Sequence, residues 1–180
     1  MKATGIVRRI DDLGRVVIPK EIRRVMRIRE GDPLEIFTGK EGEVIFKKYS
    51  AMEGDARRIQ IFADALSRAA GMPAALCDRD TVLCVSGIPR KDYADRNVSD
   101  QVSELMQERV RFLHKERAGN DFPLVSGQAA TLAAAVPIIS ESDCVGAVLL
   151  LGAENGKEPG EEELRLCKTL AVILGGQLEN

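Results

Sequence analysis

The charged side chains of this chain are divided unevenly between its first 50 residues and the rest. The sequence has 180 residues, with 26 basic and 28 acidic side chains and a formal net charge of -2. Residues 1–50 carry 12 basic against 8 acidic side chains, whereas residues 51–180 carry 14 against 20. A short basic segment followed by an acidic remainder is typical of a polyanion-binding unit joined to a second domain. The sequence therefore predicts two small domains rather than one.

Composition excludes several classes of protein. At 44% hydrophobic and 30% charged residues, the chain is expected to fold into globular domains. The longest apolar run, Cys144–Gly152, is far shorter than the ~20 residues that span a bilayer, and the N-terminus has no apolar signal-peptide core. The four cysteines are irregularly spaced, which favours reduced thiols. We therefore expect a cytoplasmic protein without a membrane partner.

The first fifty residues have the pattern of short strands and turns. Alternation, turn residues and Pro19 predict, in order, strands at Gly5–Ile10 and Arg15–Ile18, a short helix at Lys20–Arg27, and a hairpin of Pro33–Thr38 with Glu43–Tyr49. A unit this short buries too little surface to be stable alone, and it has no cysteine or histidine for a disulfide or a metal. Pairing with a second chain, with strands shared between the two, is the remaining source of stability.

Five arginines stand out in this segment. Arg8 and Arg9 lie on the first expected strand, Arg15 opens the second, and Arg23 and Arg24 lie on the helix. The planar guanidinium group pairs with phosphate and with guanine edges and keeps its charge when partly dehydrated. These residues alone predict a polyanion-binding surface, with a merely solvated basic surface as an equal alternative.

The residues carry a specific resemblance beyond charge. The stretch Met1–Arg24, with its Asp-x-Leu-Gly-Arg-Val-Val-Ile-Pro core, together with Leu34–Phe37 and Ile45–Tyr49, resembles the AbrB family of bacterial transition-state and sporulation regulators. The resemblance implies a swapped-hairpin β-barrel, in which two chains interleave their strands as a dimer, over a domain of residues 1–50. It also implies that double-stranded promoter DNA is the polyanion.

The family's DNA-binding positions are matched here by Arg8, Arg15, Arg23 and Arg24, and Arg9 is a basic residue beside them. The match is closer still to two-domain members that activate and repress late sporulation genes in the forespore. The resemblance therefore implies a nucleoid-associated transcription regulator.

The remaining residues predict a second domain of mixed helix and sheet, residues 56–180, after a polar linker at 51–55. The expected order is helix, two strands, helix, three strands and helix, at Ala56–Ala70, Ala74–Cys77, Thr81–Ser86, Ser99–Arg117, Phe122–Ser126, Ala130–Ile139, Cys144–Gly152 and Glu161–Glu179. This α+β order resembles a GAF domain, a small-molecule sensor fold. A cavity between the sheet and the segments 92–98 and 118–121 is the place where an effector of unknown identity would bind.

The outer helices of this domain suggest an oligomer contact. Apolar residues recur at spacings of three and four on the last helix, and the first helix has a similar stripe: Leu164, Cys167, Ala171, Leu174 and Leu178, with Ile59, Phe62 and Leu66. One interpretation is that the stripes pack on the domain's own sheet. The other is a four-helix seam between two chains, which would join two dimers into a tetramer.

No residue pattern predicts catalysis, a metal site or a cofactor. The only histidine, His114, is expected on a helix surface, and the cysteines are expected to pack as small apolar side chains. Cys77 and Cys84 flank one turn and could face each other as a redox pair. Two other classes stay open as alternatives: a GAF-type thiol enzyme or redox sensor fused to a DNA-binding domain, and an antitoxin-like protein.

Overall fold

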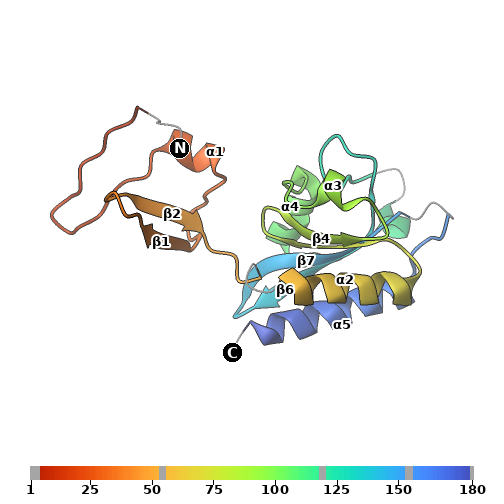
Figure 1. The fold of residues 1–180 in the computed structure, drawn as a ribbon. Helices are drawn as coiled ribbons and strands as arrows, with labels where there is room; N and C mark the ends of the chain where they lie inside the picture. The colour runs from red at the N-terminus through yellow and green to blue at the C-terminus, as the bar shows by residue number, and fades with distance from the viewer. Residues whose placement is uncertain (1–4, 53–55, 118–120, 153–155, 179–180) are drawn as a thin grey trace. The chain divides into compact units, whose positions relative to one another are not determined.

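A computed structural model describes residues 5–52, 56–117, 121–152 and 156–178 of the chain. The chain forms two compact units, Met1–Tyr49 and Ser50–Asn180 (Figure 1). Part of the expected linker, residues 53–55, lies outside the described residues.

The first unit contains one short helix and one hairpin. The helix α1, Lys20–Val25, begins directly after Pro19, where a residue without an N–H group costs no helical hydrogen bond. Strands β1, Leu34–Thr38, and β2, Val44–Lys48, pair antiparallel with Ile36 opposite Phe46. In the described part of this unit no apolar residue is buried. A single copy of the unit therefore has no hydrophobic core of its own.

The two strands expected at Gly5–Ile10 and Arg15–Ile18 are not strands in the single chain. Residues 5–19 run as an open segment with a tight turn at Asp11–Gly14 (Figure 1). A strand is defined by its ladder to a neighbour, and neither of the two sheets in the described part of the chain includes residues 5–10 or 15–18. The helix expected over Lys20–Arg27 is also shorter, because Arg27 takes a left-handed φ of 52°.

The second unit is a five-stranded antiparallel sheet with helices on both faces. Its elements are α2 (Ala56–Ala70), β3 (Ala74–Asp78), β4 (Val82–Ser86), α3 (Arg90–Tyr93), α4 (Asp100–Glu108), β5 (Phe112–Leu113), a 3₁₀ turn (His114–Arg117), β6 (Leu132–Ser140), β7 (Asp143–Leu151) and α5 (Glu161–Gln177). The strand order is β4-β3-β7-β6-β5. Helices α2 and α5 cover one face, and α3 and α4 lie on the other (Figure 1).

Alternating side chains of the central strands build two cores, one on each face. On β7, Val148 and Leu150 pack in the core beneath α2 and α5, whereas Leu149 and Leu151 point into the core beneath α4. All four are fully buried. Both faces of the central strands are thus shielded from water, so this unit has the core that the first unit lacks.

Two expected elements of the second unit are wrong. The long helix predicted over Ser99–Arg117 ends at Glu108, because Arg109 turns into the left-handed region at φ 54°. The chain then forms the two-residue strand β5 at the edge of the sheet. The strand predicted over Phe122–Ser126 is irregular, with a single bridge between Pro123 and Thr131.

Candidate nucleic-acid interface

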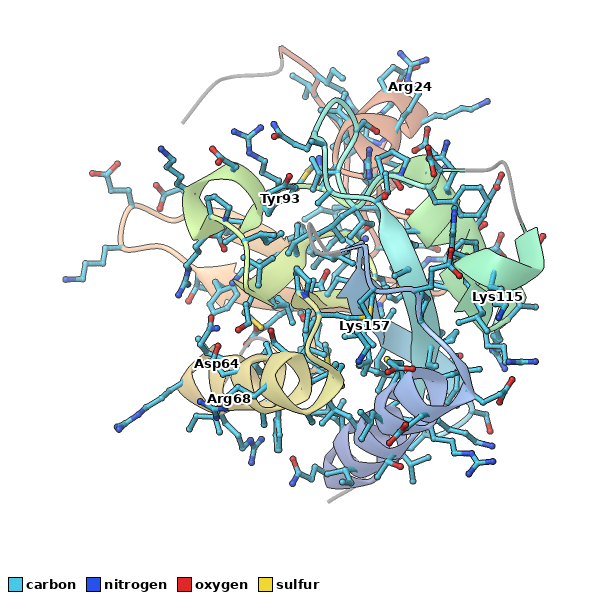
Figure 2. The ribbon with its side chains drawn as sticks, turned by 90° about the vertical axis from the view of Figure 1, so that its right-hand side faces the viewer. Arg24, Asp64, Arg68, Tyr93, Lys115 and Lys157 are labelled. Carbon is cyan, nitrogen blue, oxygen red and sulfur yellow. The ribbon has the colours of Figure 1, made fainter. Side chains whose placement is uncertain are left out.

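The five arginines singled out by the sequence are all exposed in the first unit. Arg8 and Arg9 lie on the open segment before the Asp11–Gly14 turn, and Arg15 lies directly after it. Arg23 and Arg24 form the last turn of α1, where cations interact favourably with the negative end of the helix dipole. The side chain of Arg24 extends away from the helix (Figure 2). All five cations are therefore available to a polyanion.

The Asp11–Gly14 turn is closed by the side chain of Asp11. Its Oδ1 accepts hydrogen bonds from the backbone amides of Leu13, at 3.0 Å, and Arg15, at 2.8 Å. Its Oδ2 accepts a hydrogen bond from Arg15 Nε at 2.8 Å. The amide and side chain of Arg15 both favour the charged carboxylate, so they hold the pKa of Asp11 below its usual value. Gly14, at φ 76°, supplies the left-handed residue that the turn needs.

A second polar cluster ties α1 to the hairpin. Lys48 on β2 donates a hydrogen bond from Nζ to the carbonyl oxygen of Arg27 at 2.9 Å and forms an ion pair with Asp32 at 3.2 Å. The same Asp32 oxygen accepts a hydrogen bond from the amide of Arg29 at 2.8 Å, and the carboxylate side chain is only 2% exposed. The segment after α1 is thus held against β2.

Sequence reasoning missed Asp32 and Lys48. Gly31 and Asp32 have the residue types of a turn, and 15 residues separate Asp32 from Lys48. The weak signal was an acidic residue directly after a glycine inside a basic segment, which is typical of a side chain that bonds its own turn.

The residues predicted to form an oligomer seam lie in the core of the second unit. Ile59, Leu66, Leu164, Cys167, Ala171 and Leu174 are buried there, and Phe62 and Leu178 pack against them partly buried. Of the two alternatives that the sequence left open, these residues follow the first, packing on the domain's own sheet. The apolar side chains that face outward from the same helices are Ile61, Val172 and Ile173, which are 56%, 67% and 45% exposed.

The two cysteines considered as a redox pair lie on opposite faces of the sheet. Cys84 is paired with Leu76 in the core beneath α2, whereas Cys77 is paired with Val82 in the core beneath α4. Burial raises the pKa of all four thiols, to about 11 for Cys84 and about 12 for Cys167. A buried thiol with a raised pKa is a poor nucleophile, because the thiolate is the reactive form.

The only histidine of the sequence, His114, is half-buried in the 3₁₀ turn rather than on a helix surface.

The expected effector cavity falls where the core beneath α4 is filled by apolar side chains such as Tyr93, Val98 and Leu124, and residues 118–120 lie outside the described residues. A hollow of about 220 Å³ lies instead between the start of α2 and the end of α5, lined by Ala51, Met52, Arg58, Ile59, Leu174, Gln177 and Leu178.

The described ranges hold neither a metal-ligand cluster nor a membrane-spanning helix. No group of three or more His, Cys, Asp or Glu side chains there is arranged to hold a metal ion. In the same ranges no helix has the length and hydropathy that crossing a membrane requires.

Comparison with known proteins identifies relatives of both units. The family model "Stage V sporulation protein T C-terminal, transcription factor" matches residues 58–179, and a model of the antidote-toxin recognition protein MazE, a bacterial antitoxin, matches residues 7–52. The chain is 44% identical to stage V sporulation protein T of Bacillus subtilis over 99% of both sequences. It is 59% identical to the transition state regulatory protein AbrB of Bacillus subtilis over 49 residues, which is 27% of this chain and 50% of that protein.

Solved structures show the fold of the second unit. The GAF domain of an Acinetobacter phosphoenolpyruvate-protein phosphotransferase matches with a TM-score of 0.55 and 12% identity, over 73% of this chain and 84% of that one. A type II free methionine-R-sulfoxide reductase of Thermoplasma acidophilum matches equally well, with a TM-score of 0.55 and 12% identity over 70% and 94% of the two chains. At this identity the likeness concerns the fold alone. With an AbrB-like first domain and a GAF-like second domain, the chain belongs to the stage V sporulation protein T family of transcription factors.

Proposed function

We propose that this sporulation regulator binds double-stranded promoter DNA through its first unit, with Arg8, Arg15, Arg23 and Arg24 as the DNA contacts and Arg9 beside them. The observation that carries the proposal is the exposure of all these arginines on the unit that is 59% identical to AbrB. Arginine forks suit phosphates and guanine edges, and part of the sequence selectivity comes from how readily the DNA deforms.

Two copies of the chain supply the core that one copy lacks. The apolar side chains of the first unit are exposed in a single chain, including Val7 at 87%, Val17 at 72% and Val25 at 78%. An interleaved dimer through residues 1–50 would bury them and pair residues 5–10 and 15–18 as strands. Such a dimer presents two sets of arginines to one duplex, which strengthens binding without any new type of contact.

The second unit is proposed to join two such dimers into a tetramer through the outward faces of α2 and α5. Ile61, Val172 and Ile173 are the exposed apolar residues on these faces. By its relationship to stage V sporulation protein T, the assembly would act in the forespore cytoplasm, on the nucleoid, and would activate some late sporulation genes and repress others. The hollow beside Arg58 and Gln177 is the proposed place for a small-molecule effector.

Charge-removing substitutions in the full-length protein test the DNA contacts. Each of Arg15→Ala and Arg23→Ala should weaken promoter binding about tenfold, because each removes a charge-assisted contact. Lys40→Ala is the matched control, since Lys40 is an exposed cation of the same unit at the tip of the β1–β2 hairpin. Affinity should be measured by titration of a labelled promoter fragment over a series of salt concentrations.

The logarithm of affinity should fall steeply with the logarithm of salt for the wild type, and less steeply for each arginine variant. Full promoter binding by the double variant Arg15→Ala/Arg23→Ala at moderate salt would contradict the assignment. Thermal melting curves like that of the wild type would show that the variants are folded.

Two other functions have less support. Residues 7–52 match an antitoxin model, but residues 56–178 form a folded α/β unit rather than a disordered acidic tail for a toxin to bind. The fold of the second unit also occurs in a methionine-R-sulfoxide reductase, but here burial raises the pKa of every thiol. Turnover of free methionine sulfoxide by the purified protein would revive the second alternative.

A further inference from the structure

The contact between Asp11 and Arg15 uses only one part of the guanidinium group. The carboxylate Oδ2 lies 2.8 Å from Nε, which is the inner nitrogen of the fork, and the Arg15 side chain is still 69% exposed. A guanidinium group has five N–H donors, of which four are on the two terminal Nη atoms. The ion pair therefore holds the arginine side chain at Nε and leaves the terminal Nη donors facing solvent.

We propose that Asp11 is a positioning residue for DNA binding, which holds Arg15 so that its terminal amino groups are presented to a DNA phosphate or base edge. The inference rests on the proposed DNA contact of Arg15. Three acceptor contacts fix the Asp11 carboxylate itself, two of them to backbone amides of the turn. Because the arginine is ordered before DNA arrives, less of its conformational freedom is lost on binding.

Electrostatic repulsion alone predicts that Asp11 weakens DNA binding, whereas a positioning role predicts that it strengthens promoter binding. A carboxylate next to a DNA contact repels phosphates, so its removal should strengthen binding to any duplex. If Asp11 positions Arg15, its removal should weaken binding to the promoter while leaving non-specific binding unchanged or stronger. A tethered arginine favours one geometry, whereas a free arginine can follow any phosphate. For the promoter, the two explanations therefore predict opposite changes in affinity when Asp11 is removed. For a random duplex, both predict an affinity that is unchanged or higher.

The substitution Asp11→Asn separates the tether from the turn. The asparagine carbonyl oxygen can replace Oδ1 and accept from the amides of Leu13 and Arg15. Its amide nitrogen takes the place of Oδ2, and a nitrogen donor cannot accept a hydrogen bond from Arg15 Nε. Asp12→Asn is the matched control, because it removes the same charge one residue away, at an exposed position of the same turn.

The experiment compares the full-length wild type, Asp11→Asn, Asp12→Asn, Arg15→Ala and Asp11→Asn/Arg15→Ala. Dissociation constants are measured for a promoter fragment and for a scrambled duplex of equal length, with melting temperatures as a check on folding. Asp11→Asn should weaken promoter binding by about fivefold, and the double variant should bind no more weakly than Arg15→Ala, since the tether has nothing left to hold. Asp12→Asn should bind both duplexes at least as tightly as the wild type.

Each outcome decides between the proposals. If Asp11→Asn binds the promoter as tightly as Asp12→Asn while Arg15→Ala is weakened, the positioning role is wrong and the DNA contact of Arg15 stands. If Arg15→Ala itself binds normally, both the contact and its positioning are wrong. A further variant, Asp11→Ala, removes the turn hydrogen bonds as well as the contact with Arg15. If Asp11→Ala melts at a lower temperature than Asp11→Asn, the asparagine variant has kept the turn.

Discussion

A single carboxylate, Glu163, connects the start of α5 with the end of α2. Its Oε2 accepts a hydrogen bond from the amide of Gly160 at 2.9 Å, and its Oε1 forms an ion pair with Lys157 Nζ at 2.9 Å. Lys157 also donates a hydrogen bond to the carbonyl oxygen of Ala70, the last residue of α2. Lys157 is labelled in Figure 2. An acid at the start of one helix and a cation at the end of another both complement the helix dipoles.

This arrangement predicts a dependence of stability on pH. The hydrogen bonds from Lys157 and from the backbone amides of Gly160 and Glu163 lower the pKa of Glu163 from its usual 4.5, so the native state favours the charged form. A carboxyl group with a lowered pKa stabilises the fold above pH 4.5, and this contribution is lost as pH falls through the lower native value. Glu163→Gln should therefore lower the free energy of unfolding by about 1 kcal/mol at neutral pH, and the difference should shrink below about pH 4.

Urea unfolding of the full chain over a pH series measures this difference. Glu162→Gln is the control, because Glu162 is the exposed neighbour on the same first turn of α5. If the free energies of unfolding of the wild type and Glu163→Gln differ by a constant amount from neutral pH down to about pH 3, protonation of Glu163 is not linked to stability.

At the scale of elements, α5 approaches β6 closely at Gly175. A Cβ atom at this position would collide with the carbonyl oxygen of Ile139 on β6, whereas a Cβ atom at Gly176 would meet nothing within 4 Å. Gly175→Ala should therefore push α5 off the sheet and destabilise the second unit by about 1–3 kcal/mol. Gly176→Ala should leave stability unchanged or raise it, because alanine favours a helix more than glycine does.

Thermal melting of the two alanine variants beside the wild type tests this contrast. Equal melting temperatures for Gly175→Ala and Gly176→Ala would show that α5 is not in close contact with the sheet at this point.

Most elements of this fold could be predicted from sequence, and the errors have physical causes. The bounds of α2 were predicted in full, and the strands from β1 to β4, β6 and β7 were located to within a few residues. The helix after Ser99 was extended too far, because Val110 and Leu113 continue its apolar spacing. Leu113 is buried as part of a two-residue strand, and such a short buried strand has no periodicity of its own.

The candidate site could be predicted only in part. The arginines are carried by a contiguous motif, so their identities follow from the sequence. The pairing of Asp32 with Lys48 depends on how two separate segments meet, which no local pattern encodes. Cys84 pairs with Leu76, and Leu76 and Cys77 are successive residues of one strand, so the two cysteines point to opposite faces of the sheet.

At the scale of the whole molecule, the proposed tetramer rests on the outward apolar residues of α2 and α5. Val172→Asp places a charge on the outward face of α5 that also carries Ile173, and should convert the proposed tetramer into a dimer. Native mass spectrometry of the purified protein measures the change. Gln101→Asp is the control, because it adds the same charge to an exposed position of α4, on the other face of the sheet. A tetramer that survives Val172→Asp would place the contact elsewhere.

The first unit's lack of a buried core has a consequence for gene dosage. Where the folded form of a domain exists only as a dimer, its stability is inseparable from the concentration of chains. Under the proposed interleaving, the amount of binding-competent regulator at low abundance rises with the square of the number of chains made. Halving the rate of synthesis would then remove about three quarters of the active species. Its target promoters would therefore respond more than proportionally to the expression of this protein.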